Sequence, residues 1–489
     1  MSKVRTAASL LKRFGLRRTI FYYEHRLIEK ELPFSCFSLS LPESDGMWKR
    51  AKNHPISFGK IGEQADYWLL IPEGGEIAPE FLAACSIRIA ECENRPKVVY
   101  TDTIVGGNPS DYPKDAMWHM NVPGVGPARV ALFPEYSIET SECVDYFGGA
   151  LVVDALWAKN CNLQDEESLR EFLRHHVFAT GEVLHIPRIL AKQQDDVQTL
   201  EIQHVETKDN KPLVSIIIPN KDHIDVLQTC LESLLSKTTY RNYEILVIEN
   251  NSEEDATFAY YESLQDPVRV ERCPLPWNYS AINNWAVTKT KGELLLFLNN
   301  DTEITDGAWL QRMVDYATRD GVGAVGAKLL FPDGTIQHGG VTVGIRGVAG
   351  HAYITWPGES IGYLHRLEFP QNVGAVTAAC MMVPRKVFDE VGGFDEELKV
   401  AFNDTDLCMQ IRRAGYRVVM QPQAVLTHFE SKSRGRDEQS PEKLARFNQE
   451  SMRFQRRWFR EITIGDPSYN PHLSYENDNF EVGKQWMLP

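Results

Sequence analysis

The stretch that decides the fold is GELLLFLNNDTEI, residues Gly292 to Ile304. A continuous apolar run follows the glycine, and the run ends in two amides and an acid, Asn299, Asn300 and Asp301. Such a run is typical of a strand that is buried on both faces of a parallel sheet. In open α/β sheets, ligands bind beyond the carboxyl ends of the strands. The stretch therefore predicts a buried strand whose polar end borders a binding site.

Three similar strands are predicted earlier in the chain. Their sequences are LVSIII (213–218), YEILVIEN (243–250) and VRVERC (268–273). Between the first two, DVLQTCLESLLSK (225–237) has its apolar residues at helical spacing. This alternation predicts a doubly wound α/β sheet. Polar residues follow the first two strands as PNKDH and ENNSEED, so we expect one site at the shared edge of the sheet.

The first half of the chain repeats this pattern in a weaker form. DYWLLIPEGGEI (66–77) aligns with the opening stretch, which places Pro72, Glu73 and Gly74 opposite Asn299, Asn300 and Asp301. A second alignment, of EVLHIPRILAKQ with RVVMQPQAVLTH, places Gln193 opposite His428. The first half is thus predicted to be a degenerate copy that keeps the strands and has lost the ligands.

Composition limits the class of protein. The 489 residues are 43% hydrophobic and 24% charged, which is typical of an ordinary folded chain with two to four domains. The net charge of −15 argues against nucleic acid as a general partner, because phosphate binding needs a basic surface. The nine cysteines include no Cys-x-x-Cys and predict reduced thiols. No apolar stretch approaches the ~20 residues of a spanning helix, so a cytoplasmic location is expected.

Five segments are predicted. Residues 1–40 form a basic amphipathic helix, which either lies on anionic lipid or packs on the protein with a solvated basic face. A degenerate transferase-like domain follows at 41–195, and the polar stretch 196–212 is a linker. The catalytic domain is expected at 213–440, with a C-terminal helix and tail at 441–489.

Single motifs leave alternatives open. Asn299 and Asp301, two residues apart, are able to share one divalent cation, but Asn-Asn-Asp is also ordinary turn chemistry. Asp404 begins an apparent helix and is either a cap or a general base. His428 follows a strand, where a lone histidine is more often structural than a ligand. Arg434 lies in a Ser/Gly-containing loop that either closes on phosphates or is a solvated surface loop.

Taken together, the motifs are far more specific. VSIIIPNKDH, ILVIENNS, LLLFLNNDTEI, VGGFDE, FNDTDL and VLTHFESKSRG occur in this order, and the chain resembles the inverting family-2 glycosyltransferases of the GT-A fold. It is similar in particular to bacterial rhamnosyltransferases of surface-polysaccharide, O-antigen type, biosynthesis. The resemblance covers about residues 212–471 and is fainter over 66–192. It implies a Rossmann-like mixed sheet preceded by a degenerate GT-A-like domain.

The resemblance also implies a role for each matching residue. Asp404 matches the catalytic base, and Asp301 and His428 match metal ligands. Asn299 stands at the first acid of an Asp-x-Asp motif, and Asn403 stands where Glu often precedes the base, so both positions depart from the pattern. Glu249 stands where Asp usually contacts the nucleotide base. The remaining donor-side residues are Pro219, Lys221, Asp222, Asn278, Asn300 and Arg434, and the acceptor-side residues are Gly392, Gly393, Phe394 and Asp395.

The expected function is metal-dependent, inverting transfer of a sugar from a dTDP- or UDP-sugar, with dTDP-L-rhamnose as the first donor to consider. The expected cofactor is Mn²⁺ or Mg²⁺. The expected acceptor is a hydroxyl of a surface glycan or of its lipid-linked precursor, with peripheral contact to the inner membrane face and homo-oligomerisation left open. Two alternatives remain: an inactive glycan-binding or scaffold protein, suggested by Asn299 and Asn403, and a nucleotide-sugar hydrolase.

Overall fold

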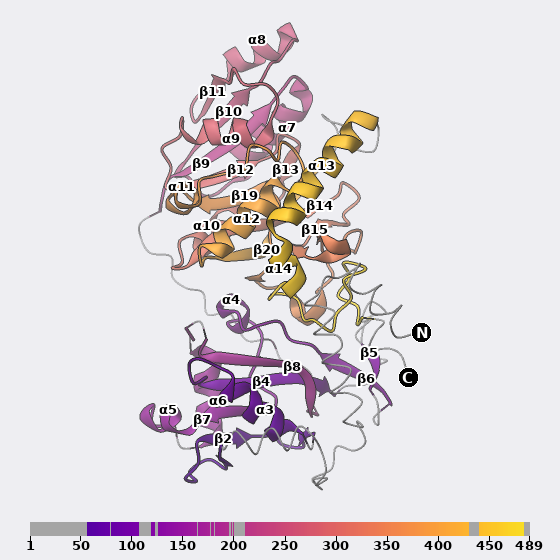
Figure 1. Ribbon diagram of the computed structural model, residues 1–489. Coiled ribbons are helices and arrows are strands. Elements are labelled where there is room, and N and C mark those ends of the chain that lie inside the picture. Colours follow the sequence, from indigo (N-terminus) through magenta and orange to yellow (C-terminus); the bar gives the residue numbers. More distant parts are fainter. Residues whose placement is uncertain are drawn as a thin grey trace, which may run out of the picture. The chain divides into compact units, whose positions relative to one another are not determined.

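The computed structural model (Figure 1) divides the chain into two units. The N-terminal unit comprises residues 1–203, 363–365 and 463–489, and the larger unit comprises 204–362 and 366–462. The structure describes residues 56–78, 80–106, 119–122, 126–163, 165–176, 178–179, 181–194, 197, 199, 211–429 and 440–483. The predicted N-terminal helix at 1–40 and Arg434 lie outside these residues. Across the described ranges, the helices are all too short or too polar to cross a membrane.

The larger unit is built on a mixed sheet with the strand order β11-β10-β9-β12-β19-β14-β20-β13. The first four strands are parallel, β19 runs antiparallel to both of its neighbours, and β14 and β20 are again parallel to each other. The strands of the main path are β9 (Val214–Asn220), β10 (Tyr243–Glu249), β11 (Val268–Arg272), β12 (Leu294–Leu298), β13 (Thr302–Ile304), β14 (Val322–Leu330), β19 (Cys380–Pro384) and β20 (Arg417–His428). At its margins lie β15 (Ile336–His338), β18 (Gln371–Asn372) and the separate hairpin of β16 (Val341–Val343) and β17 (Ala349–His351).

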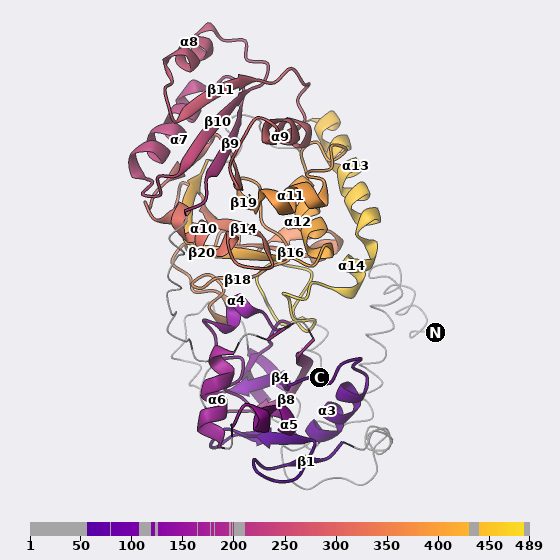
Figure 2. The same ribbon diagram turned by 90° about the vertical axis from the view of Figure 1, so that its left-hand side faces the viewer.

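Helices cover both faces of this sheet because its central strands are apolar on both sides. Successive residues of a strand point to opposite faces, so Leu296 packs in one core and Phe297 in the other. The helices α7 (Ile224–Lys237) and α10 (Trp309–Ala317) close the first core, and α9 (Tyr279–Val287), α11 (Arg385–Val391) and α12 (Asn403–Arg413) close the second (Figure 2). The short helix α8 (Asp255–Ser263) follows β10. This layering brings the carboxyl ends of β9, β10 and β12 to one edge, as the sequence predicts.

The N-terminal unit contains a second sheet with the order β1-β2-β7-β4-β6-β5, to which β8 and β3 are added. Its strands are β1 (Phe58–Gly59), β2 (Tyr67–Leu70), β3 (Glu76–Ile77), β4 (Val98–Val105), β5 (His119–Val122), β6 (Gly126–Ala131), β7 (Leu151–Asp154) and β8 (Val183–Lys192). Its helices are α3 (Phe81–Ala90), α4 (Ile138–Ser141), α5 (Ala155–Asn160) and α6 (Glu166–His175).

The two sheets repeat one pairing scheme. The path β2-β7-β4-β8-β3 has the same sequence of antiparallel, antiparallel, parallel and antiparallel pairings as β12-β19-β14-β20-β13. The register is shared as well, because Glu76 pairs with Lys192 as Glu303 pairs with Thr427. Gln193 therefore holds the position that His428 holds in the larger sheet. Among the described residues, the N-terminal sheet has no strands in the places of β10 and β11.

The C-terminal region differs from the sequence-based division. Helix α13 (Pro441–Arg457) packs on the larger unit, where Phe454 and Trp458 share a small core with Val343 and Met409. Helix α14 (Phe459–Ile464) follows, and the residues from 463 onward group with the N-terminal unit. There the Nδ2 group of Asn470 donates hydrogen bonds to the buried carboxylate of Asp102, 368 residues away. A contact at this separation leaves no local pattern in the sequence.

Candidate active site

The end of β12 is fixed to its neighbours by its own polar residues. The backbone N–H of Asn299 donates to the carbonyl of Ala379 at 3.0 Å. The side chain of Asn300 donates to Asn220 Oδ1 at 2.5 Å, which joins the ends of β12 and β9. Asn300 was predicted to bind the donor, but in the structure its side-chain amide donates a hydrogen bond to another residue of the protein, Asn220. Its contribution is to hold the edge of the sheet on which the neighbouring Asp301 lies.

Asp301 and His428 meet directly after β12. Antiparallel pairing of β13 with β20 places Thr302 opposite His428, so His428 Nε2 lies 3.0 Å from Asp301 Oδ1. The amide nitrogen Nδ2 of Asn299 is 3.3 Å from the same nitrogen of His428. Both Asp301 and His428 are buried. The sequence-predicted metal ligands are therefore within reach of one ion.

The hydrogen bonds of His428 fit a cation at this point. Its Nδ1 lies 2.6 Å from Gln337 Oε1, an acceptor, so Nδ1 carries the proton. Nε2 of a neutral ring then directs a lone pair at the Asp301 carboxylate, and two acceptors 3.0 Å apart are favourable only with a proton or a cation between them. Within the described residues, no group of three or more His, Cys, Asp and Glu side chains is arranged so that it could hold a metal ion. Other positions around an ion here would be filled by water or phosphate.

Asp404 lies at the start of α12 and is joined to the same edge by the Thr377–Ala379 segment. Phe402, which precedes the helix, has a φ of 61°, an uncommon value for a residue with a side chain. Asp404 Oδ2 accepts from the backbone N–H of Ala378 at 3.1 Å, and its Oδ1 accepts from the backbone N–H of Thr405 at 2.7 Å. The side chain remains partly exposed. The Thr377–Ala379 segment thus contacts Asp404 at one residue and Asn299 at the next.

On the donor side, Glu249 has one oxygen available. The residue is buried, and its Oε1 accepts from the backbone N–H of Ser252 at 2.7 Å. Within the described part of the chain, Oε2 accepts no hydrogen bond, although Arg272 Nε lies 3.2 Å from it. A buried carboxylate oxygen without a hydrogen-bond donor is uncommon and is suited to a ligand N–H.

Two predicted donor residues, Asp222 and Asn278, make structural hydrogen bonds. Asp222 Oδ1 accepts from the backbone N–H groups of Glu253 and Glu254 at 2.9 and 3.0 Å, so it fixes the chain that leads into α8. Asn278 is the N-cap of α9, where it accepts from Ala281 and donates to the carbonyl of Glu396. Their side chains are occupied by capping, a use of Asp and Asn that sequence spacing does not distinguish from ligand binding.

Two other donor residues remain at the edge of the sheet. Pro219 lies in β9 opposite Ile248. Lys221 follows β9 and is paired with Glu253 at 2.9 Å on the surface. Neither contact prevents the residue from binding a ligand, so Pro219 and Lys221 stay predictions for the donor side.

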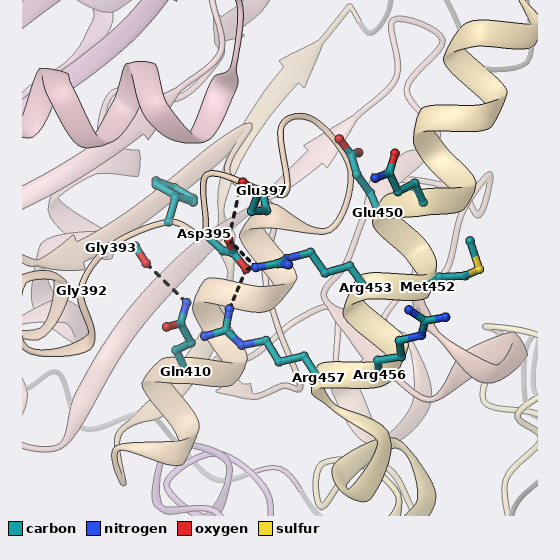
Figure 3. A pocket seen from close by; sticks show the side chains of 12 residues that line it. Gly392, Gly393, Asp395, Glu397, Gln410, Glu450, Met452, Arg453, Arg456 and Arg457 are labelled. Carbon is teal, nitrogen blue, oxygen red and sulfur yellow. Dashed lines mark hydrogen bonds and ion pairs between the residues drawn. The ribbon is translucent and has the colours of Figure 1, made fainter.

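The acceptor-side residues Gly393, Phe394 and Asp395 line a cavity of about 820 Å³ between their loop, α12 and α13 (Figure 3). Phe394 is only 3% exposed and packs its ring on Phe297, with centroids 4.9 Å apart, so it belongs to the core. Asp395 is paired with Arg453 and Arg457, both at 2.9 Å. The acidic group expected beside the acceptor is thus already held by α13.

None of the sequence motifs predicts these partners on α13. Arg457 also pairs with Asp406 at 3.0 Å, and Trp458 Nε1 donates to the other oxygen of Asp406 at 2.6 Å. Burial raises the pKa of Asp406 to about 6, against the opposing effects of Trp458 and Arg457. Asp404 contacts Ala378 and Asp406 contacts α13, so the two acids of the FNDTDL motif point to different sides of α12.

The larger unit has the mixed sheet of the GT-A glycosyltransferase fold, as the sequence predicts, with acidic residues at the end of β12 and the start of α12. Residues 215–392 match the family model "Glycosyl transferase family 2".

Three curated relatives are similar to this chain. An uncharacterised protein of Sinorhizobium fredii, y4gI, is 49% identical over 57% of this chain and 31% of its own length. The O-antigen biosynthesis protein RfbC of Myxococcus xanthus is 45% identical over 54% of this chain and 20% of its own length. An N-acetylglucosaminyl-diphospho-decaprenol L-rhamnosyltransferase of Mycobacterium tuberculosis is 28% identical over 33% of this chain and 51% of its own length. The chain therefore spans less than a third of the first two relatives.

Proposed function

We propose that the protein is a metal-dependent, inverting glycosyltransferase. The observation that carries this proposal is the joining of Asp301, His428 and Asp404 at one edge of the sheet, through the hydrogen bonds of the Thr377–Ala379 segment. Inversion requires one base and a counter-charge for the departing diphosphate, and it requires no carboxylate nucleophile.

Each residue has a defined task in this proposal. Asp404, partly exposed and held by two backbone N–H groups, accepts the proton of the acceptor hydroxyl. Asp301 and His428 are the residues that would hold the ion. A divalent ion bound there supplies positive charge to the leaving diphosphate. Glu249 Oε2 accepts from the N–H of a uracil or thymine ring, which favours a UDP- or dTDP-sugar.

The donor sugar and acceptor are proposed from the relatives. The mycobacterial relative is named for L-rhamnosyl transfer and the Myxococcus relative for O-antigen biosynthesis, which supports dTDP-L-rhamnose and a surface glycan or its lipid-linked precursor. A lipid-linked acceptor would bring the protein to the inner membrane face.

A second candidate is an inactive glycan-binding protein of the same pathway. Asn299 and Asn403 stand where acids are expected, and the Nδ2 group of Asn403 is buried without a partner among the described residues. An inactive protein would keep the fold and bind glycan, but it would bind no nucleotide with the help of metal.

Calorimetry with nucleoside diphosphates separates the two candidates. We expect dTDP or UDP to bind in the presence of Mn²⁺ and to bind at least 10-fold more weakly without it or in Asp301→Ala, because the diphosphate loses its counter-charge. Glu303→Ala is the control, since Glu303 lies two residues away and pairs only weakly with Lys237, at 3.5 Å. A folded wild type that binds neither nucleotide with any divalent metal overturns the enzyme proposal.

A further inference from the structure

Two adjacent residues of β15, Gln337 and His338, contact the two halves of the candidate active site. The strand pairs with β14, and successive side chains of a strand point to opposite faces. Gln337 points to His428 on the metal side, and His338 points to Thr377, beside the residue that binds Asp404. Both residues lie in the stretch TIQHGGV, and neither is in contact with the expected reacting atoms.

Gln337 fixes the ring of His428. Its Oε1 lies 2.6 Å from His428 Nδ1, and both side chains are buried. A hydrogen bond at Nδ1 sets the tautomer, which leaves the lone pair of Nε2 for Asp301 and a cation. Without this acceptor the ring is free to turn or to carry its proton on Nε2. Gln337 therefore determines whether His428 is ready to bind metal.

His338 fixes the Thr377–Ala379 segment. Its Nε2 accepts from the backbone N–H of Thr377 at 3.4 Å, so the proton lies on Nδ1, which faces His351 Nδ1 at 2.9 Å. The side chain is fully buried. The next backbone N–H along the segment, that of Ala378, donates to Asp404 Oδ2, and the carbonyl of Ala379 accepts from Asn299. A displacement of the Thr377 backbone would therefore move the groups that hold Asp404 and the end of β12.

We propose that Gln337 and His338 are positioning residues that hold the metal ligand and the general base in register with each other. Gln337 acts on metal affinity through His428, and His338 acts on proton transfer through Ala378 and Asp404. This inference rests on the proposed function.

The metal half is tested by Mn²⁺ binding to the full-length protein, with calorimetry as the readout. We expect Gln337→Leu to weaken Mn²⁺ binding 10- to 100-fold, as is typical for loss of a group that orients a metal ligand. Gln337→Glu keeps an acceptor for Nδ1–H and should bind Mn²⁺ within about 3-fold of wild type. Gln421→Leu is the control, because Gln421 is a buried amide of the same strand as His428 and accepts from Gln423 instead.

The base half is tested by kinetics at saturating Mn²⁺. We expect His338→Leu to lower kcat 10- to 100-fold with little change in the donor KM, because a misplaced base affects proton transfer more than donor binding. The split between a lowered kcat and an unchanged donor KM is the signature of a displaced base, because general loss of structure would weaken donor binding as well. His338→Gln places an amide oxygen near the former Nε2 and should recover most of kcat.

The outcomes separate this inference from the proposed function. A wild type that binds no Mn²⁺-nucleotide removes the proposed function itself. A wild type that binds, with Gln337→Leu equal to wild type or Gln337→Glu as defective as Gln337→Leu, overturns the metal half. A folded His338→Leu with wild-type kcat, or with kcat and donor binding weakened equally, overturns the base half. If His338→Leu fails to fold, His338→Gln decides: the proposal requires it to have near-normal kcat, and a large loss in this folded variant contradicts it.

Discussion

At the scale of single residues, Asp404 is the group on which turnover should depend most. Asp404→Asn keeps the size of the side chain and removes the basic oxygen, so we expect kcat to fall by on the order of 10²- to 10⁴-fold. Nucleotide binding should remain near the wild-type value, because Asp404 accepts its hydrogen bonds from Ala378 and Thr405, whereas the nucleotide and the metal are assigned to Glu249 and Asp301.

The control for this change is Asp406→Asn. Asp406 has the same side chain two positions along the helix and contacts α13 instead. If Asp404→Asn retains more than a tenth of wild-type kcat, another group takes the proton and the assignment of the base is wrong.

Some residue-level features of the site follow from the sequence. A histidine after one strand and an aspartate after a buried strand are predicted to share a metal, and His428 and Asp301 lie 3.0 Å apart, while the shared metal stays a prediction. Asp222 and Asn278 are predicted on the donor side, and in the structure they fix the starts of helices, a use of Asp and Asn that is visible only once the backbone is known. No role was predicted for Gln337, because no sequence spacing distinguishes a glutamine that orients a histidine from any other glutamine.

At the scale of elements, α13 and α12 are joined through the buried carboxylate of Asp406. Asp406→Ala would leave Trp458 Nε1 without its acceptor and would remove one of the two carboxylates that pair with Arg457, and we expect it to reduce the free energy of unfolding by about 3 kcal/mol. Asp406→Asn keeps an oxygen for Trp458 and should cost less than about 1 kcal/mol at pH 7, because burial already raises the pKa of Asp406 to about 6 and disfavours its charge. Urea denaturation of both variants at pH 7 measures the difference.

The pH dependence gives a second check on Asp406. Its folded pKa lies above the ordinary value, so its contribution to stability is present below about pH 4 and is lost as the pH rises through 6. Asp406→Asn should remove this part of the pH dependence. Equal losses in the alanine and asparagine variants at pH 7 would contradict the role given to the hydrogen bond from Trp458.

Elements of the sheet were predictable because burial on two faces produces continuous apolar runs, as in Leu294–Leu298. The docking of α13 was not. Its contacts with Asp395 and Asp406 join residues about 50 positions apart, and its sequence is polar and basic enough to suit any surface helix. Hydrophobic periodicity predicts that a helix forms. It does not predict which residues the charged side chains of that helix will pair with.

At the scale of the whole molecule, the repeated strand pairing explains why one half of the chain is expected to bind donor and the other is not. The N-terminal sheet keeps the equivalents of β12, β19, β14, β20 and β13. It has Gln193 at the position of His428, and among its described strands none corresponds to β10, which carries Glu249. The sequence alignment predicted the exchanged residues. The grouping of residues 463–489 with this unit was not predicted, because Asn470 reaches Asp102 across most of the chain.

The buried cluster around Asp102 makes the stability of the N-terminal unit depend on pH. His185 Nε2 lies 3.0 Å from Asp102 Oδ1, and both side chains are almost completely buried. Burial alone would lower the pKa of His185, but the Asp102 carboxylate outweighs burial and raises the pKa to about 9. The proton is thus bound more tightly in the folded state than in the unfolded chain, where the pKa is about 6.5. The stabilisation is fully present below pH 6.5 and is lost as the pH rises through 9.

We therefore expect the wild-type N-terminal unit to lose on the order of 2–3 kcal/mol of stability between pH 6.5 and 9. His185→Gln replaces the imidazolium with a neutral donor for Asp102, so it should be less stable at pH 6.5 and nearly independent of pH over this range. Denaturant unfolding at pH 6.5, 7.5 and 9 measures the change. His176→Gln is the matched control, because burial lowers the pKa of His176 and leaves it neutral across the window. If His185→Gln keeps the wild-type dependence of stability on pH, another group carries the charge, and the pairing of His185 with Asp102 is not its source.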